Sequence, residues 1–283
     1  MINFLKKILE KRKTKRTFKE YGYKVRSFSL REEGEVKFAQ WLNPAEQPKE
    51  ISQSKVDFFK KFIKRESLAI DIGAHIGDTT IPMAIAAGKE GLVLALDPNP
   101  YVFKILEVNS SLNKDKARII PLCFAATDAD GEFYYNSSEA TFNNGGISEI
   151  KSKKHGRYSL NQKIKGINLE NYLRKNYRDL LPNLSLIKID AEGYDKEVLK
   201  SISKLIEEFK PSIIVECFSK LTKQERYELF DVVENKGYIL FYFQDFEVNT
   251  DIKQIAKNDM TNWEHFDIYA IPQEKYCPVR ATG

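Results

Sequence analysis

From Ser67 onward, short apolar runs alternate with segments of helical spacing, and this alternation constrains the fold more than any other feature of the sequence. The apolar runs lie at 68–72, 92–97, 117–124, 184–190, 212–218, 238–243 and 266–271. Helices fit between them at 78–88, 99–112, 194–209 and 222–236. Such alternation is typical of a parallel sheet with helices on both faces. The sequence therefore predicts an α/β fold with a doubly wound, mostly parallel, seven-stranded sheet. Its last strand is antiparallel, because no full helix separates the final two runs.

Two regions fall outside this alternation. Residues 1–50 are predicted to be an N-terminal extension, with a basic helix over 1–20 followed by a β-hairpin. The main domain then covers 51–283 and carries a long insertion at 129–183. In the insertion we expect a strand at 131–136, a Gly- and Asn-rich loop at 143–146 and a helix near 168–178. Long insertions in compact domains often form lids over a site.

The net charge of +5 comes from the first twenty residues, which hold eight Lys or Arg and two Glu. The rest of the chain is therefore close to neutral, and its composition gives no signal for a nucleic-acid partner. The basic helix could pack on the body as a solvated face, or it could contact an anionic membrane peripherally. No run of 18 apolar residues occurs, so no segment is expected to span a bilayer.

Three cysteines are widely separated, at Cys123, Cys217 and Cys277. This spacing indicates neither a disulfide framework nor a zinc site, and Cys123 and Cys217 lie in apolar runs that predict burial. A reducing cytoplasm is the simplest location for such a chain, with the membrane surface as the alternative. The oligomeric state is left open by the sequence.

The first motif with chemical meaning is DIGAHIGD, from Asp71 to Asp78, where a strand ends and a helix begins. Gly73 and Gly77 allow the backbone to turn sharply and to approach a ligand closely. Their spacing is G-x-x-x-G, which excludes the dinucleotide motif G-x-G-x-x-G and with it a dinucleotide oxidoreductase. Asp71 precedes the first glycine and could accept hydrogen bonds from the ammonium of an amino-acid-like ligand.

The second motif is LALDPNP, where Asp97 ends the next strand, twenty residues beyond Gly77. A carboxylate at this place can bind both hydroxyls of a ribose. Asp97 could instead cap the following helix, since Pro98 comes next. The combination with the glycine turn favours a nucleoside-binding site.

The third motif is IKIDAEGYD, which places Asp190, Glu192 and Asp195 at the carboxyl end of a buried strand. Ionisable groups at such a place are costly unless they are paired or used in function. Glu216, a lone acid in the apolar run SIIVECF, could form a wall of the same cleft.

Together with Asn109 and Asn113 in EVNSSLN, these motifs make residues 52–272 resemble the FkbM family of methyltransferases. That resemblance implies a Rossmann-like class I fold, S-adenosyl-L-methionine as cofactor, and O-methylation of a sugar, glycan or small-molecule hydroxyl. One departure is His75, where the family more often has Asn. The resemblance implies that Asp128 lies near the adenine and that Asp190 and Glu192 face the methyl group or the acceptor. The full cofactor-binding set is then Asp71, Gly73, Ala74, His75, Gly77, Asp97, Pro98, Asn99, Asp128 and Asp190.

Methyl transfer to a hydroxyl needs a group that accepts the hydroxyl proton. Glu192 is our first candidate for this base, and Asp190 and His75 are the others. No metal ligand set is assigned, although the carboxylates could alternatively hold a divalent cation that orients a diol. His155 and His265 have no companion cluster and are expected at the surface or in the core.

Two other functions remain open at this stage. The basic N-terminus would suit an RNA methyltransferase, although its charge is confined to twenty residues. A noncatalytic binding or scaffold protein could also retain this fold, but the intact set of Asp71, Gly73, Gly77 and Asp97 argues against it.

Overall fold

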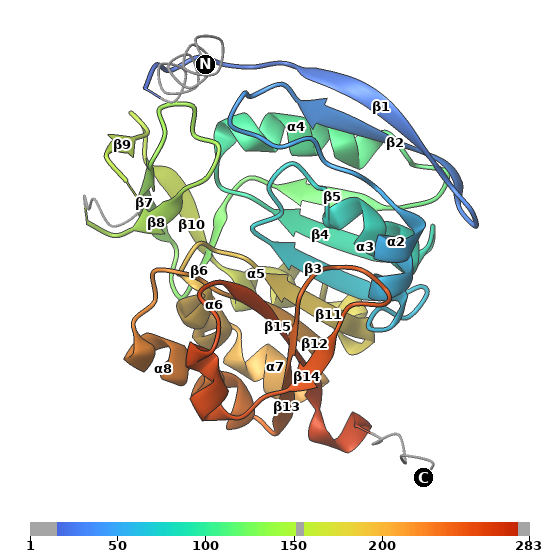
Figure 1. Ribbon diagram of the computed structural model, residues 1–283, viewed down its shortest axis with the longest axis vertical. Helices are drawn as coiled ribbons and strands as arrows, with labels where there is room; N and C mark the ends of the chain where they lie inside the picture. The colour runs from blue at the N-terminus through green and yellow to red at the C-terminus, as the bar shows by residue number, and fades with distance from the viewer. Residues whose placement is uncertain (1–15, 151–155, 277–283) are drawn as a thin grey trace, which may run out of the picture.

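A single sheet of eight strands forms the centre of the computed structural model, which describes residues 16–150 and 156–276 (Figure 1). Its strand order is β14-β13-β15-β12-β11-β3-β4-β5. The strands are β3 (Leu68–Ile72), β4 (Leu92–Leu96), β5 (Ile119–Leu122), β11 (Leu184–Ile189), β12 (Ser212–Cys217), β13 (Tyr238–Phe243), β14 (Ile252–Gln254) and β15 (Phe266–Pro272). The α/β doubly wound prediction is therefore confirmed, and most of the predicted helix over 1–20 lies outside the described residues.

Strand directions in this sheet follow the prediction, with one addition. Strands β5, β4, β3, β11 and β12 pair in parallel, whereas β15 lies antiparallel between β12 and β13. The additional strand, β14, pairs with β13 at the sheet edge. All three of its residues are exposed, so the sequence contained no apolar pattern that would predict it.

Alternate residues of each central strand are buried on opposite faces of the sheet. In β3, Leu68, Ile70 and Ile72 pack into one apolar cluster, and Ala69 packs into the other. The first cluster includes apolar side chains of α5 (Leu169–Asn176), α6 (Asp195–Ser201), α7 (Ser203–Phe209) and α8 (Lys223–Glu234). The second includes side chains of α2 (Gln53–Lys60), α3 (Thr80–Ala87) and α4 (Pro100–Ser111).

One predicted helix is wrong in its extent. The segment 194–209 forms two helices, α6 and α7, which are separated at Ile202. Ile202 has φ −108° and ψ 17°, outside the helical region, and its side chain is fully buried. No Gly or Pro marks this position, so the break results from packing of Ile202 into the core rather than from a local sequence signal.

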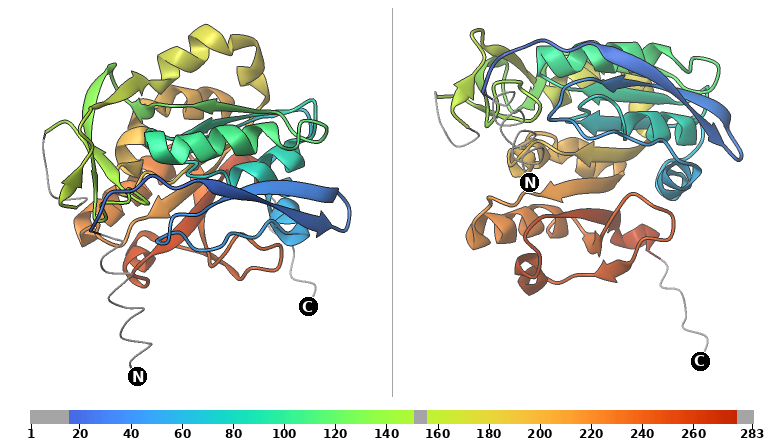
Figure 2. Two further views of the ribbon diagram at one scale, coloured as in Figure 1. Left: turned by 90° about the horizontal axis from the view of Figure 1, so that it is seen from above. Right: turned by 45° about the horizontal axis from the view of Figure 1, so that its top comes forward.

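The N-terminal hairpin consists of β1 (Tyr23–Leu30) and β2 (Gly34–Trp41), and it lies alongside α4 in both views of Figure 2. Two side chains of α4 hold it there. The Asn109 amide bonds to both N–H and C=O of Ala39, and the Asn113 amide bonds in the same way to Lys37. Each amide thus makes the pair of hydrogen bonds that a residue of a neighbouring strand would make. In addition, apolar side chains of β2 belong to the second apolar cluster, together with side chains of the main sheet.

The insertion builds a second, smaller sheet in the order β6-β10-β7-β8, with β9 paired to β7. Its strands are β6 (Ala125–Thr127), β7 (Gly131–Ser137), β8 (Gly146–Ser148), β9 (Tyr158–Ser159) and β10 (Ile164–Asn168). The predicted strand and helix correspond to β7 and α5. The other strands have two to five residues, too few for a periodic pattern to show.

Candidate functional site

A cavity of about 530 Å³ lies at the carboxyl ends of β3, β4, β11 and β12. This is the expected place for a ligand in a doubly wound sheet, and the volume suits a small-molecule cofactor. Its lining includes the turn after β3, the end of β4, residues 124–126, the loop 143–147 of the insertion, the ends of β11 and β12, and the N-terminal segment 45–49.

The turn after β3 depends on unusual backbone angles. Gly73 has φ 75°, His75 has φ 49° and Gly77 has φ 92°. A Cβ atom on Gly73 would lie 1.8 Å from the carbonyl oxygen of Asp190, so only glycine fits there. The N–H groups of Gly73 and Ala74 both donate to the carbonyl of Leu96 at 2.9 Å, which fixes the turn against β4. Gly73, Ala74 and His75 line the cavity, whereas Gly77 lies behind it.

Asp71 does not line the cavity. Its side chain is fully buried, and its Oδ2 accepts hydrogen bonds from the hydroxyls of Thr79 and Thr80 at 3.1 and 2.7 Å. Its Oδ1 lies 3.3 Å from Nζ of Lys188. Oδ1 is buried and accepts no hydrogen bond from the described residues, so Lys188 is its charge partner only. Because Asp71 has no surface on the cavity, a ligand in the cavity would not reach it for the predicted contact with an ammonium group.

Asp97 does face the cavity and is nearly buried. Its carboxylate accepts from the N–H groups of His75 and Asn99, each at 2.9 Å. Burial raises the pKa of this carboxyl to about 6, against a usual 3.8. The cap of helix α4 is Asn99, whose side chain accepts from the Tyr101 N–H. Asp97 is therefore not needed as the helix cap, and its remaining lone pairs are available to ligand hydroxyls.

The neighbours of Asp97 differ in their positions. Pro98 lines the cavity, but Asn99 is fully buried and donates to the carbonyl of Phe142 at 2.7 Å. Asn99 thereby ties the β4 end to the insertion. Asp128 is exposed and does not line the cavity, whereas Phe124, Ala125 and Ala126 form an apolar wall there.

An acidic wall, Asp190, Glu192 and Glu216, borders the opposite side of the cavity. Glu192 has φ 52°, and burial, together with the charges of Asp190 and Asp195, raises its pKa to about 7. Burial and the neighbouring carboxylates also hold the pKa of Glu216 well above its usual value. Asp190 is more open, with 42% of its side chain exposed, and lies 3.6 Å from Lys188 Nζ.

Glu216 has one oxygen without a protein partner. Its Oε1 lies 3.5 Å from Nδ1 of His265, but its Oε2 is buried and finds no hydrogen-bond donor among the described residues. His265 is at the surface, as the sequence predicted, and also lines the cavity. The single acid in SIIVECF is thus part of the cleft, as its sequence context suggested.

Asp195 has a different position. It is almost completely buried, and its two oxygens accept from the N–H groups of Ala191 and Gly193 at 2.8 and 2.9 Å. These bonds shape the turn that presents Glu192 to the cavity. Asp195 therefore supports the acidic wall without lining it.

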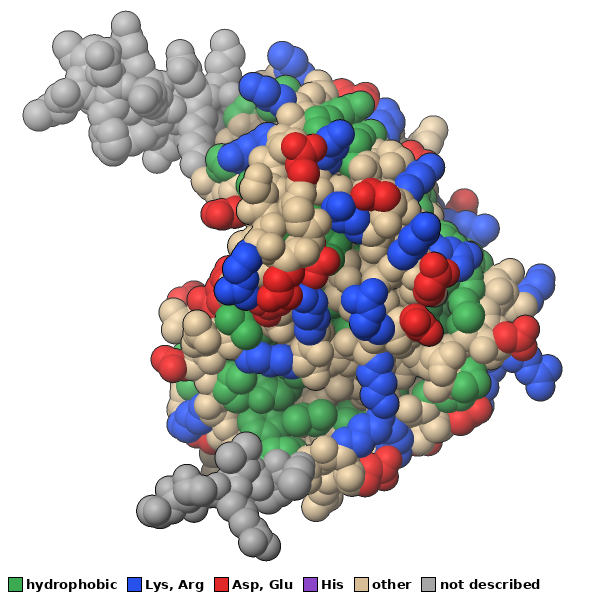
Figure 3. All heavy atoms as spheres, turned by 90° about the vertical axis from the view of Figure 1, so that its right-hand side faces the viewer, with side chains coloured by type: hydrophobic (Ala, Val, Ile, Leu, Met, Phe, Trp, Pro, Cys, Tyr) green, Lys and Arg blue, Asp and Glu red, His purple; other side chains and the backbone are tan. Residues whose placement is uncertain are grey.

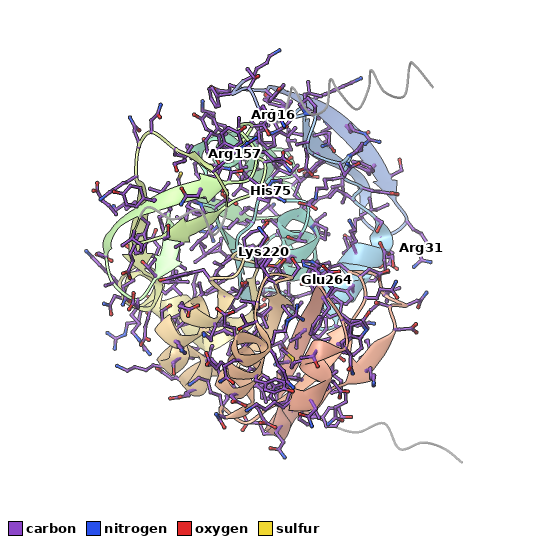
Figure 4. All side chains as sticks on the ribbon, turned by 60° about the vertical axis from the view of Figure 1, so that its left-hand side comes forward. Arg16, Arg31, His75, Arg157, Lys220 and Glu264 are labelled. Carbon is purple, nitrogen blue, oxygen red and sulfur yellow. The ribbon has the colours of Figure 1, made fainter. Side chains whose placement is uncertain are left out.

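The segment 45–49 and Lys55 were missed by sequence reasoning, although they line the cavity. Lys49 Nζ lies 3.1 Å from Asp78 and 3.2 Å from Glu46, and Nε2 of His75 lies 3.8 Å from Glu46. Figure 4 labels His75 near the centre of the molecule, where these parts meet. The segment lies outside the resembling residues, so no motif pointed to it.

Cys123, predicted to be buried, is exposed, because it follows the end of β5 at the sheet edge. Cys217 is buried as expected, and Cys277 and His155 lie outside the described residues. Within 16–150 and 156–276, no group of three His, Cys, Asp or Glu side chains is arranged to hold a metal ion. In the same ranges, no helix has the length and apolar character needed to cross a membrane.

Comparison with known proteins gives a family match. The family profile described as the methyltransferase FkbM domain matches residues 71–240. Methyltransferase sdnD of Sordaria araneosa is 24% identical over 190 residues, which is 60% of this chain and 72% of that protein.

Solved structures with a similar chain path include two methyltransferases. Methyltransferase FkbM from Methylobacillus flagellatus has 13% identity and a TM-score of 0.43, covering 77% of this chain and 51% of that one. The O-methyltransferase from Bacillus cereus, solved in complex with SAH, has 12% identity and a TM-score of 0.44, covering 80% and 84%. TM-scores this low carry no argument about function.

Proposed function

Since this chain belongs to the methyltransferase FkbM domain family and uses S-adenosylmethionine, we propose that it methylates a hydroxyl group of a sugar, a glycan or another small molecule. The observation that carries this proposal is Glu192, a half-buried carboxyl with a raised pKa in the lining of the same cavity as Asp97. A hydroxyl acceptor requires such a base, because its own proton is held tightly at neutral pH.

The cavity fits the cofactor by the chemistry of its lining. Asp97 would hold the ribose hydroxyls, and the apolar residues Phe124, Ala125 and Ala126 would contact the adenine. Gly73 and Ala74 leave room for the ligand beside the turn, because neither carries a large side chain. The cofactor supplies a methyl group on a positively charged sulfur, which is a good leaving group.

Glu192 would take the proton of the acceptor hydroxyl onto a carboxylate oxygen. A base with a pKa of about 7 is largely ionised at slightly alkaline pH and still binds a proton strongly. The neighbouring Asp190, held by Lys188, adds negative charge that keeps Glu192 basic. Asp195 fixes the turn that carries Glu192, so the base is held in place before the acceptor arrives.

His75 is a weaker candidate for the base. Its Nε2 lies 3.0 Å from the carbonyl oxygen of Asn143, which can only accept a hydrogen bond. Nε2 therefore carries the proton in this contact and is not free to accept another. Asp190 remains a second candidate, since it is closer to solvent than Glu192.

The acidic wall also bears on the RNA alternative. Asp190 and the ionised form of Glu192 put negative charge on this wall of the cavity, which would repel a polyanionic acceptor. On the face drawn in Figure 3, Lys and Arg side chains alternate with Asp and Glu, so no extended basic surface leads to a phosphate backbone there. Both observations favour an uncharged acceptor.

The test is transfer of a labelled methyl group from S-adenosylmethionine to a panel of monosaccharides, polysaccharides and RNA. We expect label on a carbohydrate hydroxyl, and Glu192→Gln should lower turnover by about 100-fold or more. Its affinity for S-adenosylhomocysteine, measured by calorimetry, should stay within about twofold, because glutamine fills the same space.

Glu197→Gln is the matched control, since Glu197 lies on α6 with 41% of its side chain exposed. It should retain full turnover. Label found on RNA alone would contradict the proposed acceptor. Equal turnover of Glu192→Gln and Glu197→Gln would remove Glu192 from the role of base.

A further inference from the structure

The burial of Asp71 leaves one end of the cofactor without an assigned partner. S-adenosylmethionine ends in an amino acid, with one ammonium and one carboxylate, and both need charged or polar partners when they leave water. Asp71 is enclosed by Thr79, Thr80 and Lys188 and has no surface on the cavity. The groups that bind this end must therefore come from other residues of the lining.

One cluster at the cavity has the required charges. Lys49 Nζ lies between Asp78 Oδ2, at 3.1 Å, and Glu46 Oε1, at 3.2 Å. The three side chains are 29%, 16% and 4% exposed, so their charges are only partly screened by water. All three line the cavity next to the glycine turn. With one cation and two anions, the cluster offers charged partners both to a carboxylate and to an ammonium.

A second and independent observation points to a ligand at the same place. Asn143 is buried, lines the cavity, and its Oδ1 has no hydrogen-bond partner among the described residues. Its backbone carbonyl contacts His75 Nε2, which in turn lies 3.8 Å from Glu46 Oε2. The backbone of Asn143 is therefore linked through His75 to Glu46 of the Lys49 cluster. Its side-chain Oδ1 requires a donor that the described residues do not provide.

We propose that the amino-acid end of S-adenosylmethionine binds here, with its carboxylate on Lys49 and its ammonium on Glu46 and the side-chain oxygen of Asn143. The ammonium pairs with Glu46 and supplies the donor that Asn143 Oδ1 needs, and the carboxylate pairs with Lys49, so each charge of the amino-acid end meets a charge of opposite sign. All three residues belong to the N-terminal extension or to the insertion, outside the motifs of the glycine turn. The inference rests on the use of this cofactor by the chain.

Two other lysines line the cavity, and both Lys188 and Lys49 are paired with acids, but the Lys188 side chain is only 4% exposed against 29% for Lys49. Lys188 is buried against Asp71 and Asp190, at 3.3 and 3.6 Å. The Nζ of Lys55 donates to the carbonyl of Glu50 at 3.0 Å and is in an exposed position. Lys49 is the cation that combines partial burial, a place next to the glycine turn and acidic neighbours on both sides.

The backbone around Lys49 does not depend on its ammonium group. The Lys49 N–H donates to Gln40 Oε1 at 2.6 Å, and the Asn43 side chain holds both Ala45 N–H and the carbonyl of Thr141. Replacing the side chain of Lys49 should therefore leave the loop in place, which makes a binding experiment interpretable.

The experiment compares two ligands that differ in the amino-acid end. S-adenosylhomocysteine carries it, and 5′-methylthioadenosine lacks it while keeping the nucleoside. Calorimetry with Lys49→Met should show about 10- to 100-fold weaker binding of S-adenosylhomocysteine, the usual effect of losing a charged hydrogen bond. Binding of 5′-methylthioadenosine should change by less than about twofold. Lys55→Met is the matched control and should leave both affinities unchanged.

Glu46→Gln is a second, milder variant, and it should also weaken the binding of S-adenosylhomocysteine more than the binding of 5′-methylthioadenosine. If Lys49→Met lost affinity equally for both ligands, or lost affinity for neither, the inference would be overturned while the cofactor assignment stayed intact. Failure of the unaltered protein to bind S-adenosylhomocysteine at all would overturn the cofactor assignment and this inference with it.

Discussion

The contact between Asn109 and the N-terminal hairpin gives a prediction whose size can be worked out from the structure. The Asn109 side chain is 1% exposed and makes three hydrogen bonds. Its Oδ1 accepts from Ala39 N–H at 2.6 Å, and its Nδ2 donates to the carbonyls of Ala39 at 3.1 Å and Ile76 at 2.7 Å. Truncation by Asn109→Ala therefore leaves three backbone groups without their partner.

Each buried polar group that loses its partner costs about 1–3 kcal/mol. Three such groups would cost up to about 9 kcal/mol, but water can enter the space that the amide leaves and satisfy some of them. We therefore expect Asn109→Ala to lower the free energy of unfolding by about 3–5 kcal/mol. Asn113→Ala, which frees only the two groups of Lys37, should cost about 1–3 kcal/mol.

Urea denaturation followed by circular dichroism measures both values, with Ser110→Ala as control on the same helix. Ser110 is not fully buried and bonds only within its helix, to the carbonyl of Glu107, so its loss should cost less than about 0.5 kcal/mol. If Asn109→Ala were no less stable than Ser110→Ala, the amide would not be what docks the hairpin, and the reasoning from unpaired groups would be refuted.

Two further predictions concern the turns at the site. Gly73→Ala should lower stability by about 3 kcal/mol or more, because its Cβ would lie 1.8 Å from the Asp190 carbonyl oxygen at φ 75°; thermal unfolding at an unchanged midpoint would contradict this. The pKa of Glu192 is raised from 4.5, its ordinary value, to about 7 in the folded protein. The favourable contribution of its protonated form to folding stability is therefore complete below pH 4.5 and is lost as the pH rises through 7. The free energy of unfolding of Glu192→Gln, measured relative to the unaltered protein, should therefore increase by about 2 kcal/mol between pH 5 and pH 8.5. If urea denaturation showed the same difference between the two proteins at every pH in that range, the carboxyl would not titrate in this way.

The strands of the main sheet could be predicted because each is buried on both faces. Most residues buried on both faces of a sheet are apolar, so β4 reads as a continuous apolar run and β3 as one interrupted only by Asp71. The edge strand β14 is exposed throughout and carries no such run. The small strands β6, β8, β9 and β10 were missed for a different reason: β6 is buried throughout, but strands of two to five residues are too short for a pattern to show.

The site could be predicted in part, for a related reason. Asp97, Asp190 and Glu192 follow buried strands directly, and the carboxyl ends of parallel strands meet at one edge of the sheet. Asp71 shows the limit of this argument. An acid at a strand end can face the cleft or the interior, and the choice depends on Lys188, which lies on a strand more than a hundred residues away. No local pattern contains that information.

The segment 45–49 lies at the cavity because the hairpin before it is docked on α4, and Asn109 is central to that docking. The same amide donates to the carbonyl of Ile76, within the glycine turn. One side chain thus fixes both the hairpin that leads to Lys49 and the turn that faces it across the cavity. If Lys49 and Glu46 bind the amino-acid end of the cofactor, a substitution that displaces the hairpin should weaken binding of that end more than binding of the nucleoside end. Asp97 is held independently, by its place after β4 and by the N–H groups of His75 and Asn99. The N-terminal extension, which has no recognisable motif of its own, accordingly contributes both to the lining of the cavity and to the apolar core.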